Sequence, residues 1–429
     1  MIEAIRLGAP AGRPDASVSA PLAPPPLAHR LLRLVWEERA ISRAEIARRA
    51  ALSRSTVSEG VTPLLASGLV LESGTGASRG GRRPIVLAFQ DEAHLLAGVD
   101  VTTTGITVVL TNLRGERRAV RTAAHDVEQD PAGTRGLVAA LLAACLQQAG
   151  EEAPRLLGIG VAVPSPVDPR HPERLHPLSL PAWRGRHGLE ALLPRFGVPV
   201  FIDNDANLGA LAERWWGAAR GVDDFTYIKL ATGVGSGHMM AGRIYRGGTG
   251  VAGEIGHLTI DPHGPPCNCG NRGCLGTYVG AEALVARARA LLPQYPGSPL
   301  AAGTVTAARV EAAAEAGDPL AVQVMHEVAE ALGIAVAGVL NLLNPQLVIL
   351  DGGLARLEEQ LLQPLRETVF RRTFVSAVAS ATIRSSTLGA EGVALGAAAL
   401  VLAAALRDPL LFPSLATPIR ASGPPPDPS

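Results

Sequence analysis

The stretch GVDVTTTGITVVL, residues 98–110, places a short polar turn between two apolar, β-branched segments. Segments of this kind on either side of a turn are typical of a β-hairpin. A similar passage begins near Phe225, and each passage continues into alternating helix and strand patterns. The repetition predicts an α/β protein made of two similar lobes with a cleft between them. The strands are expected at 94–101, 106–111, 117–123, 225–232 and 236–241.

Apolar residues at helical spacing follow each group of strands and predict the helices of the two lobes. These helices are expected at 134–149, 206–216, 281–292, 305–316, 320–343, 354–370 and 389–406. We assign 91–203 together with 389–412 to the first lobe and 204–388 to the second. The segment 26–90 is expected to fold as a separate unit in front of them.

Composition is that of an ordinary globular protein of two or three domains, since 47% of the 429 residues are hydrophobic and the formal net charge is zero. Segments 1–25 and 413–429 are rich in Pro, Ala, Gly and Ser, and we expect flexible tails there. The N-terminus lacks the apolar core of a signal peptide, and the longest apolar run, 392–406, is shorter than a membrane span. We expect a cytoplasmic protein with no membrane contact. Lys229 is the only lysine among 39 Lys and Arg residues, which we attribute to coding bias.

The front unit, 26–90, carries ten arginines against five acidic residues. Within it, Ser42 caps one predicted helix and Ser53 opens a second after a short turn. Two short strands around a Gly and Arg loop follow. This order predicts a winged helix-turn-helix that binds double-stranded DNA; the alternative is a helical cap or protein-interaction module with a solvated arginine face. DNA contacts are expected from Arg54, Ser55, Thr56 and Ser58 of the second helix and from Arg79, Arg82 and Arg83 of the wing.

Pro63 conflicts with the second of these helices. Proline inside a helix lacks the N–H for the bond to the fourth residue before it, which typically costs about 3 kcal/mol. Gly60 weakens the same turn. We therefore expect the helix to bend or break near Gly60 and to leave the DNA-reading residues intact.

Three of the four cysteines lie within HGPPCNCGNRGCLG, residues 263–276, and His257 precedes them. One His and three Cys ligands suit tetrahedral Zn²⁺, and a site with four protein ligands is structural rather than catalytic. Reduced thiols without metal are the alternative. The fourth cysteine, Cys145, is expected to be a small buried apolar residue. The sequence predicts a structural zinc held by His257, Cys267, Cys269 and Cys274.

AGEIGH, the spacing from His257 to CNCGNRGC, FIDNDANLGALAE and KLATGVGSG together resemble the ROK family of repressors, open reading frames and kinases. With its added DNA-binding unit, the chain is similar to the sugar-responsive repressors of that family. The resemblance implies an actin-like, ribonuclease-H-like pair of lobes preceded by a winged helix-turn-helix, and a homodimer or homotetramer.

The resemblance also implies a sugar site. Asn204 and Asp205 would bind sugar hydroxyls, Glu254 and His257 would complete the polar ring, and Asp205 would be the general base in a kinase. Without the resemblance, Asn204 and Asp205 are read equally well as a helix cap. The family often has a sugar-binding glutamate where this chain has Gly276, so a weaker or different sugar preference is expected.

The first phosphate-binding turn departs from the kinase pattern. Asp100 and Thr104 are present, but Thr102 and Thr103 replace the two glycines that let backbone amides approach phosphate. A second phosphate turn is intact, as is the DGGL segment near adenosine, although these glycines serve tight turns equally well. The remaining positions implied for phosphate and nucleotide are Thr232, Gly233, Gly235, Gly237, Gly352 and Gly353.

The sequence is consistent with three functions. The first is a sugar-responsive repressor that has lost kinase activity, in which a small sugar changes how a dimer fits operator DNA. The second is an active ATP-dependent and Mg²⁺-dependent sugar kinase with a fused DNA-binding unit. The third is a repressor whose pocket is only a scaffold and which a protein partner controls.

Overall fold

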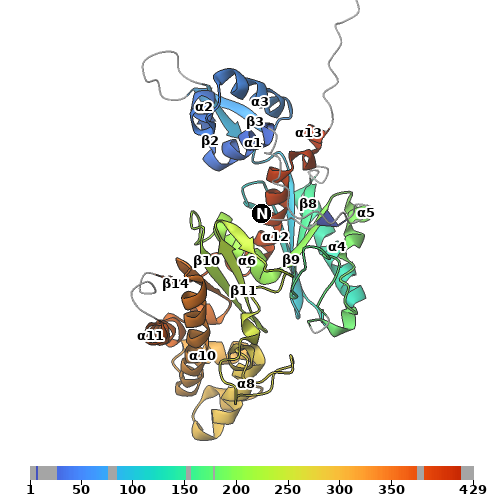
Figure 1. The fold of residues 1–429 in the computed structure, drawn as a ribbon. Helices are drawn as coiled ribbons and strands as arrows, with labels where there is room; N and C mark the ends of the chain where they lie inside the picture. The colour runs from blue at the N-terminus through green and yellow to red at the C-terminus, as the bar shows by residue number, and fades with distance from the viewer. Residues whose placement is uncertain are drawn as a thin grey trace, which may run out of the picture.

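The computed structural model describes residues 6–7, 27–75, 85–150, 156–176, 179–373 and 381–416. Figure 1 shows a small unit at one end, then a lobe crossed by helix α12, then a second lobe at the other end. Each part has a sheet of its own, with three strands in the small unit, six in the first lobe and five in the second. The two-lobe α/β fold with a preceding small unit agrees with the sequence expectation.

The small unit is a winged helix. It contains α1 (Leu27–Glu38), β2 (Ala40–Ser42), α2 (Arg43–Ala50), α3 (Arg54–Ala66), β3 (Val70–Thr75) and β4 (Ile85–Phe89). Its three strands are antiparallel in the order β2-β4-β3. As expected, Ser42 caps α2, accepting from the Glu45 amide at 3.2 Å, and Ser53 caps α3, accepting from the Thr56 amide at 3.1 Å. The wing residues 76–84, including Arg79, Arg82 and Arg83, lie outside the described residues.

Of the bend or break expected in α3, the break is wrong. The helix runs without a break from Arg54 to Ala66, with Pro63 inside it. Val57, Val61 and Leu64 are fully buried in the core of the unit. Burial of one such side chain contributes roughly 1.5–3 kcal/mol, so three of them outweigh the cost of one proline.

The first lobe contains a six-stranded sheet in the order β1-β9-β8-β5-β6-β7. Helix α4 (Pro131–Ala149) packs on β6 and β7, and α12 (Gly392–Arg407) packs on β5 and β8. A Cβ at Gly160 would lie 1.8 Å from the Ala397 carbonyl oxygen, so α12 can approach the sheet this closely only over glycine. The strands are β5 (Leu95–Val101), β6 (Gly105–Thr111), β7 (Arg117–Ala124), β8 (Leu156–Val163) and β9 (Val200–Asn204), with the short α5 (Leu192–Phe196) before β9.

A part of each terminal segment, 1–25 and 413–429, is structured, although we expect flexible tails from the sequence. Within 1–25, Arg6–Leu7 form strand β1, which pairs antiparallel with Val200 and Phe201 of β9. At the other end, Pro413–Ala416 form the short helix α13. The remaining residues of these segments lie outside the described part of the chain.

The second lobe repeats the strand arrangement of the first. β10 (Phe225–Leu230), β11 (Val234–Met240) and β12 (Arg243–Tyr245) are antiparallel neighbours, and β10 pairs in parallel with β13 (Leu347–Asp351), as β5 does with β8. β14 (Thr382–Ser385) completes the sheet. This duplication is the one that the two hairpin patterns predict. The helices are α6 (Asp205–Trp215), α7 (Gly276–Val279), α8 (Ala281–Leu291), α9 (Ala307–Glu315), α10 (Pro319–Leu343) and α11 (Gln363–Arg372).

The single helix expected at 354–370 is wrong. A 3-10 turn at Leu354–Arg356 and a π-helical segment at Glu358–Leu362 precede α11. Leu354, Leu361 and Leu365 are buried, so the apolar spacing is satisfied without one continuous α-helix.

Helix α10 is, within the described ranges, the one helix long and apolar enough to cross a membrane, and 67% of its most apolar window is buried. It packs against α9 and α11, so α10 is a core helix of the second lobe.

Helices α6 and α12 form the interface between the two lobes. They pack on one another and so join the two sheets.

Candidate functional site

The four expected metal ligands come together in the second lobe. The candidate ligand atoms of His257, Cys267, Cys269 and Cys274 all lie within 4.8 Å of one another. His257 Nδ1 is 3.6 Å from Cys267 Sγ, and Cys269 Sγ is 3.7 Å from Cys274 Sγ. Tetrahedral zinc with Zn–S near 2.3 Å separates two sulfurs by about 3.8 Å and a sulfur from a nitrogen by about 3.6 Å. The residues therefore fit a structural zinc.

The backbone around the cluster is held by bridges rather than by a helix or sheet. Isolated β-bridges join Thr259 to Cys274 and Pro266 to Arg272. The Gly273 carbonyl accepts a bond from the Ile260 amide at 2.9 Å. Cys274 is buried, and burial raises the pKa of its thiol to about 12. A divalent cation is the natural way to keep such a thiol ionised at neutral pH.

Asn204 is a helix cap in this structure. Its side-chain oxygen accepts from the Ala206 amide at 2.9 Å and the Asn207 amide at 3.2 Å, and its Nδ2 donates to the Ser165 carbonyl at 3.2 Å. The capping interpretation therefore holds for Asn204. Because Ser165 follows β8, the same side chain also ties the start of α6 to the first lobe.

Asp205 pairs with the only lysine of the chain. Lys229 Nζ lies 2.8 Å from Asp205 Oδ2, and both side chains are 14% exposed. Burial alone lowers the pKa of Lys229, but the charges of Asp100 and Asp205 outweigh burial and raise it. The ammonium group therefore stays charged at the point where a kinase needs an unhindered general base.

Asp100 belongs to the same group of charges. It is fully buried, and one of its carboxylate oxygens has no hydrogen-bond partner among the described residues. Burial raises the pKa of Asp100 to about 6, against the opposing effect of Lys229. Asp351, at the end of β13, also contributes to the field at Lys229 and accepts a hydrogen bond from Tyr227. The single ammonium group of Lys229 thus offsets the negative charge of three carboxylates, those of Asp100, Asp205 and Asp351.

The two expected phosphate turns touch each other. Thr103 Oγ1, in the turn between β5 and β6, donates to Thr232 Oγ1, in the turn between β10 and β11, at 3.2 Å. Thr102 Oγ1 donates to the Gly105 carbonyl at 3.0 Å, closing its own turn. The Thr103 side chain therefore links the two lobes through its hydrogen bond to Thr232, which a glycine at this position could not do. Thr104 lies beside it in the same turn.

Some of the glycines that the resemblance implies for nucleotide binding have a structural role in this chain. Gly352 has φ +120°, and a Cβ there would lie 1.8 Å from the Leu230 carbonyl oxygen. Such a position admits only glycine, whether or not a nucleotide is bound. At Gly233, by contrast, a Cβ would meet no atom within 4 Å. The turn between β10 and β11 is therefore open around Gly233, while Gly235 and Gly237 continue into β11 and Gly353 follows Gly352.

Glu254 stands directly before the 3-10 turn Ile255–His257. Although Glu254 is exposed, the protein atoms crowded around it raise its pKa, and the negative charge of Asp205 adds to the effect. The effect of the Asp205 charge on Glu254 indicates that the two carboxylates lie near each other. Because His257 Nδ1 faces Cys267, its other ring nitrogen is left for a ligand.

The expected DNA-reading residues lie at the start of α3. Arg54, Ser55 and Ser58 are exposed, and Thr56 is half-buried. Ser58 donates to the Arg54 carbonyl at 3.0 Å, and the Ser55 and Thr56 hydroxyls bond with Ser53 at 2.7 and 2.8 Å. Arg54 makes no ion pair with any described residue, so its guanidinium group is available to a phosphate or base.

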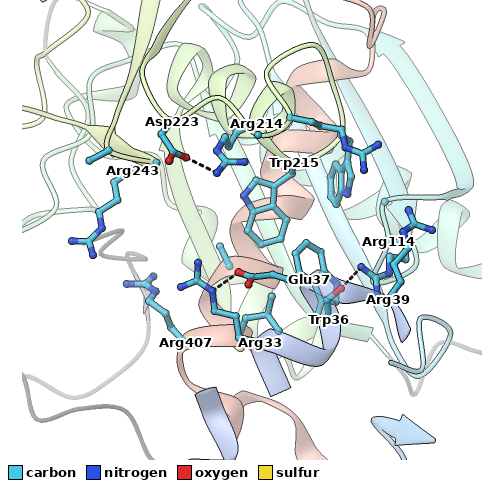
Figure 2. A pocket seen from close by; sticks show the side chains of 18 of the residues that line it. Arg33, Trp36, Glu37, Arg39, Arg114, Arg214, Trp215, Asp223, Arg243 and Arg407 are labelled. Atoms are coloured by element: carbon cyan, nitrogen blue, oxygen red, sulfur yellow. Dashed lines mark hydrogen bonds and ion pairs between the residues drawn. The ribbon is translucent and has the colours of Figure 1, made fainter. Parts of the chain in front are cut away.

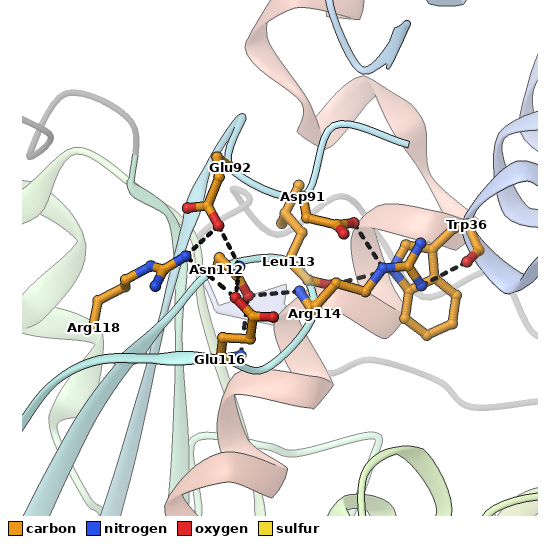
Figure 3. A network of polar contacts seen from close by, with 8 residues as sticks. All are labelled: Trp36, Asp91, Glu92, Asn112, Leu113, Arg114, Glu116 and Arg118. Carbon is orange, nitrogen blue, oxygen red and sulfur yellow. Dashed lines mark hydrogen bonds and ion pairs between the residues drawn. The ribbon is translucent and has the colours of Figure 1, made fainter. Parts of the chain in front are cut away.

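The winged helix is joined to the first lobe by a polar network that sequence analysis missed (Figure 3). Arg114, in the turn after β6, donates to Asp91 at 2.7 Å and to the Trp36 carbonyl at 2.6 Å. The Trp36 indole donates to the Leu113 carbonyl at 3.1 Å. Helix α1 is thereby fixed to a hairpin of the lobe.

Sequence analysis missed two further features of the site. The first is Lys229, whose uniqueness we attribute above to coding bias but which pairs with Asp205; a single lysine in 429 residues is a signal for such a role. The second is Asp203, directly before Asn204; it is buried and paired with the buried Arg246, with Arg246 Nε at 3.1 Å from Asp203 Oδ2. Asp203 Oδ1 also accepts from the Asn204 amide at 2.8 Å, so this ion pair anchors the start of α6.

Known proteins resemble this chain over most of its length. Residues 96–404 match the family model described as ROK family. Over 390 residues the chain is 31% identical to a protein named xylose repressor from Caldicellulosiruptor bescii, covering 90% of this chain and 96% of the relative.

Solved structures agree with this match. The structure of a ROK family transcriptional regulator, a homolog of the E. coli MLC protein, has a TM-score of 0.78 and 26% identity, covering 90% of this chain and 98% of that protein. A ROK family glucokinase from Streptomyces griseus, solved with glucose and AMPPNP, has a TM-score of 0.62 and 29% identity, covering 71% of this chain and 98% of its own. Since the matched residues are well over half of the chain and the relatives align along nearly their whole length, this chain belongs to the ROK family.

Proposed function

We propose that this chain is a sugar-responsive transcriptional repressor. The observation that carries the proposal is a winged helix, with Arg54 exposed at the start of α3, joined to ROK lobes in one chain. Relatives named as repressors align with both parts, whereas the glucokinase structure leaves a part of this chain unmatched. The unit 26–90 would bind operator DNA, and the lobes 91–203 with 389–412 and 204–388 would bind the sugar.

The proposed sugar site lies where the lobes meet near the start of α6. Asn204, Asp205, Glu254 and His257 would surround the sugar hydroxyls, and a zinc ion on His257, Cys267, Cys269 and Cys274 would fix the orientation of the His257 ring. Asn204 would contribute through its amide group while capping α6. We further propose a cytoplasmic homodimer or homotetramer, which would suit an operator of two half-sites.

Loss of kinase activity is part of the proposal. Lys229 occupies Asp205 Oδ2, so the carboxylate is a poor base for a sugar hydroxyl. The Thr103–Thr232 hydrogen bond closes the two turns that would hold the phosphates of ATP and its Mg²⁺. The test is ADP release with a sugar panel of xylose, glucose and N-acetylglucosamine. We expect no release above background; release that Asp205→Ala abolishes would contradict this part of the proposal.

The DNA-binding part is tested with purified full-length protein and a labelled fragment from upstream of its own gene. We expect saturable binding that weakens as salt is raised, because arginine–phosphate contacts release counterions. Arg54→Ala should weaken binding roughly tenfold, as expected for loss of about 1–3 kcal/mol at one arginine contact. Arg289→Ala, which removes an exposed arginine of α8, is the matched control. Equal binding by both variants would contradict the assignment of α3.

A further inference from the structure

A cavity of about 860 Å³ lies between the winged helix and the lobes (Figure 2). Its walls come from α1, the turn after β6, the end of α6, the turn between β11 and β12, and α12. These elements belong to all three parts of the fold. The volume suits a small molecule of about the size of a nucleotide, since ligand pockets commonly enclose roughly 300–1,000 Å³.

The cavity is strongly basic although the chain as a whole carries no net charge. Among the described residues, the acidic ones that line it are Glu37, Glu116 and Asp223. Guanidinium groups gathered in this way repel one another unless an anion is bound between them. The seven arginines that line it are Arg33, Arg39, Arg114, Arg214, Arg220, Arg243 and Arg407.

Several of these arginines form no ion pair with a carboxylate of the described residues. Arg33 pairs with Glu37 and Arg214 with Asp223, at 2.7 and 2.6 Å. Arg39, Arg220 and Arg243 are exposed and make no ion pair with any described residue. Arg214 Nε is buried with no hydrogen-bond partner among the same residues. The wall therefore holds donors that the protein itself does not satisfy.

Three of the four tryptophans of the chain also line the cavity. The rings of Trp36 and Trp215 are 4.9 Å apart between centroids, and Trp216 meets Trp215 edge to face. Figure 2 shows Trp36 and Trp215 together, with the side chains of Arg33, Arg243 and Arg407 around them. Because Trp36 belongs to α1 and Trp215 to α6, this contact spans the boundary between the winged helix and the lobes.

We propose that this cavity binds a phosphorylated small molecule, such as a nucleotide or a sugar phosphate, at a site separate from the proposed sugar site. Arginine recognises phosphoryl oxygens through paired N–H donors, and the indole rings offer an apolar surface to the rest of the ligand. The ligand would touch both α1 and the lobes. Its binding would therefore stabilise one placement of the DNA-binding unit, next to the Arg114 network that already joins the two.

Tryptophan fluorescence of the full-length protein tests this site, because three of the four tryptophans report on it. The probes are ATP, glucose 6-phosphate and inorganic phosphate, with adenosine and glucose as unphosphorylated counterparts. We expect saturable quenching by at least one phosphorylated probe, and at most a weak response to the counterparts. Response to ATP alone would identify a nucleotide, to glucose 6-phosphate alone a sugar phosphate, and to all three a site for the phosphoryl group itself.

The double variant Arg220→Ala/Arg243→Ala should weaken binding of the probe at least about tenfold, and calorimetry should show the same loss. The control Arg289→Ala/Arg372→Ala removes two exposed arginines of the second lobe and should leave binding unchanged. Glu254→Ala, in the proposed sugar site, should also leave it unchanged, which separates this site from the proposed function.

Three results would overturn the proposal. One is the absence of saturable binding by every phosphorylated probe, and a second is binding that the double variant does not weaken. The third is a double variant that loses affinity for DNA while its response to the phosphorylated probes stays unchanged, because the arginines would then serve DNA phosphates.

Discussion

Lys229 shows how one residue can change the charge of a neighbouring site, here that of Asp205. The Asp205 motif could be read from the sequence, because Asn204 and Asp205 are adjacent and stand directly before a helix. The Lys229 contact could not, because it joins residues 24 positions apart through the packing of α6 on β10. Charge neutralisation of Asp205 is a property of the folded chain, and it supports the proposed loss of kinase activity.

Replacing Lys229 by Met should lower the free energy of unfolding by about 3–5 kcal/mol, because it leaves buried carboxylates without their cation. Urea denaturation at pH 7 measures this difference. Lys229→Arg keeps the charge and should recover a large part of the loss. Equal stability of Lys229→Met and the natural chain would show that the ammonium group is not needed there.

The raised pKa of Asp100 predicts that the stability of the protein depends on pH. Its pKa in the folded chain, about 6, is above the ordinary value of 3.8, so the folded state holds this proton more tightly than the unfolded state does. Relative to Asp100→Asn, the natural chain should therefore lose stability as pH rises from about 4 to about 6, by about 3 kcal/mol in total. Thermal unfolding of both proteins across this range tests it. A stability difference that stays constant with pH would contradict the burial of a charged Asp100.

At the scale of elements, local patterns identified the hairpins and caps but not all helix interiors. The strands 94–101 and 225–232 were predictable because apolar residues lie between clear turn signals. Of the two outcomes expected near Gly60, a bend or a break, α3 has no break, and 354–370 is not a single helix, because buried side chains decide both cases. Val61 and Leu64 hold α3 together over Pro63, and Leu361 is buried from a π-helical turn.

The loop around Cys267, Cys269 and Cys274 has no helix or sheet of its own to hold it, so its order should depend on the metal. Elemental analysis should find about one zinc per chain. Chelation should lower the thermal stability and abolish any sugar response, while DNA binding by the distant winged helix persists. Cys267→Ser should behave like the chelated protein, and Cys145→Ala should retain zinc because Cys145 is buried in α4, in the first lobe. A metal-free natural chain with full sugar response would exclude this role.

At the scale of the whole molecule, the basic cavity and the Arg114 network lay beyond sequence analysis. Their residues come from segments as distant as Trp36 and Arg407, and no local pattern brings such segments together. The lobes themselves were predictable because the same hairpin occurs twice. The sequence thus describes the separate parts, while the contacts that couple them depend on how the parts pack.

The central claim is that a sugar bound between the lobes changes the hold of the winged helix on DNA. Fluorescence anisotropy with the labelled upstream fragment, titrated in the presence and absence of each member of the sugar panel, measures this directly. We expect one of these sugars to change the affinity for DNA by about 5-fold or more, and Glu254→Ala to remove the effect without weakening DNA binding itself. An affinity for DNA that no sugar of the panel alters would contradict the claim.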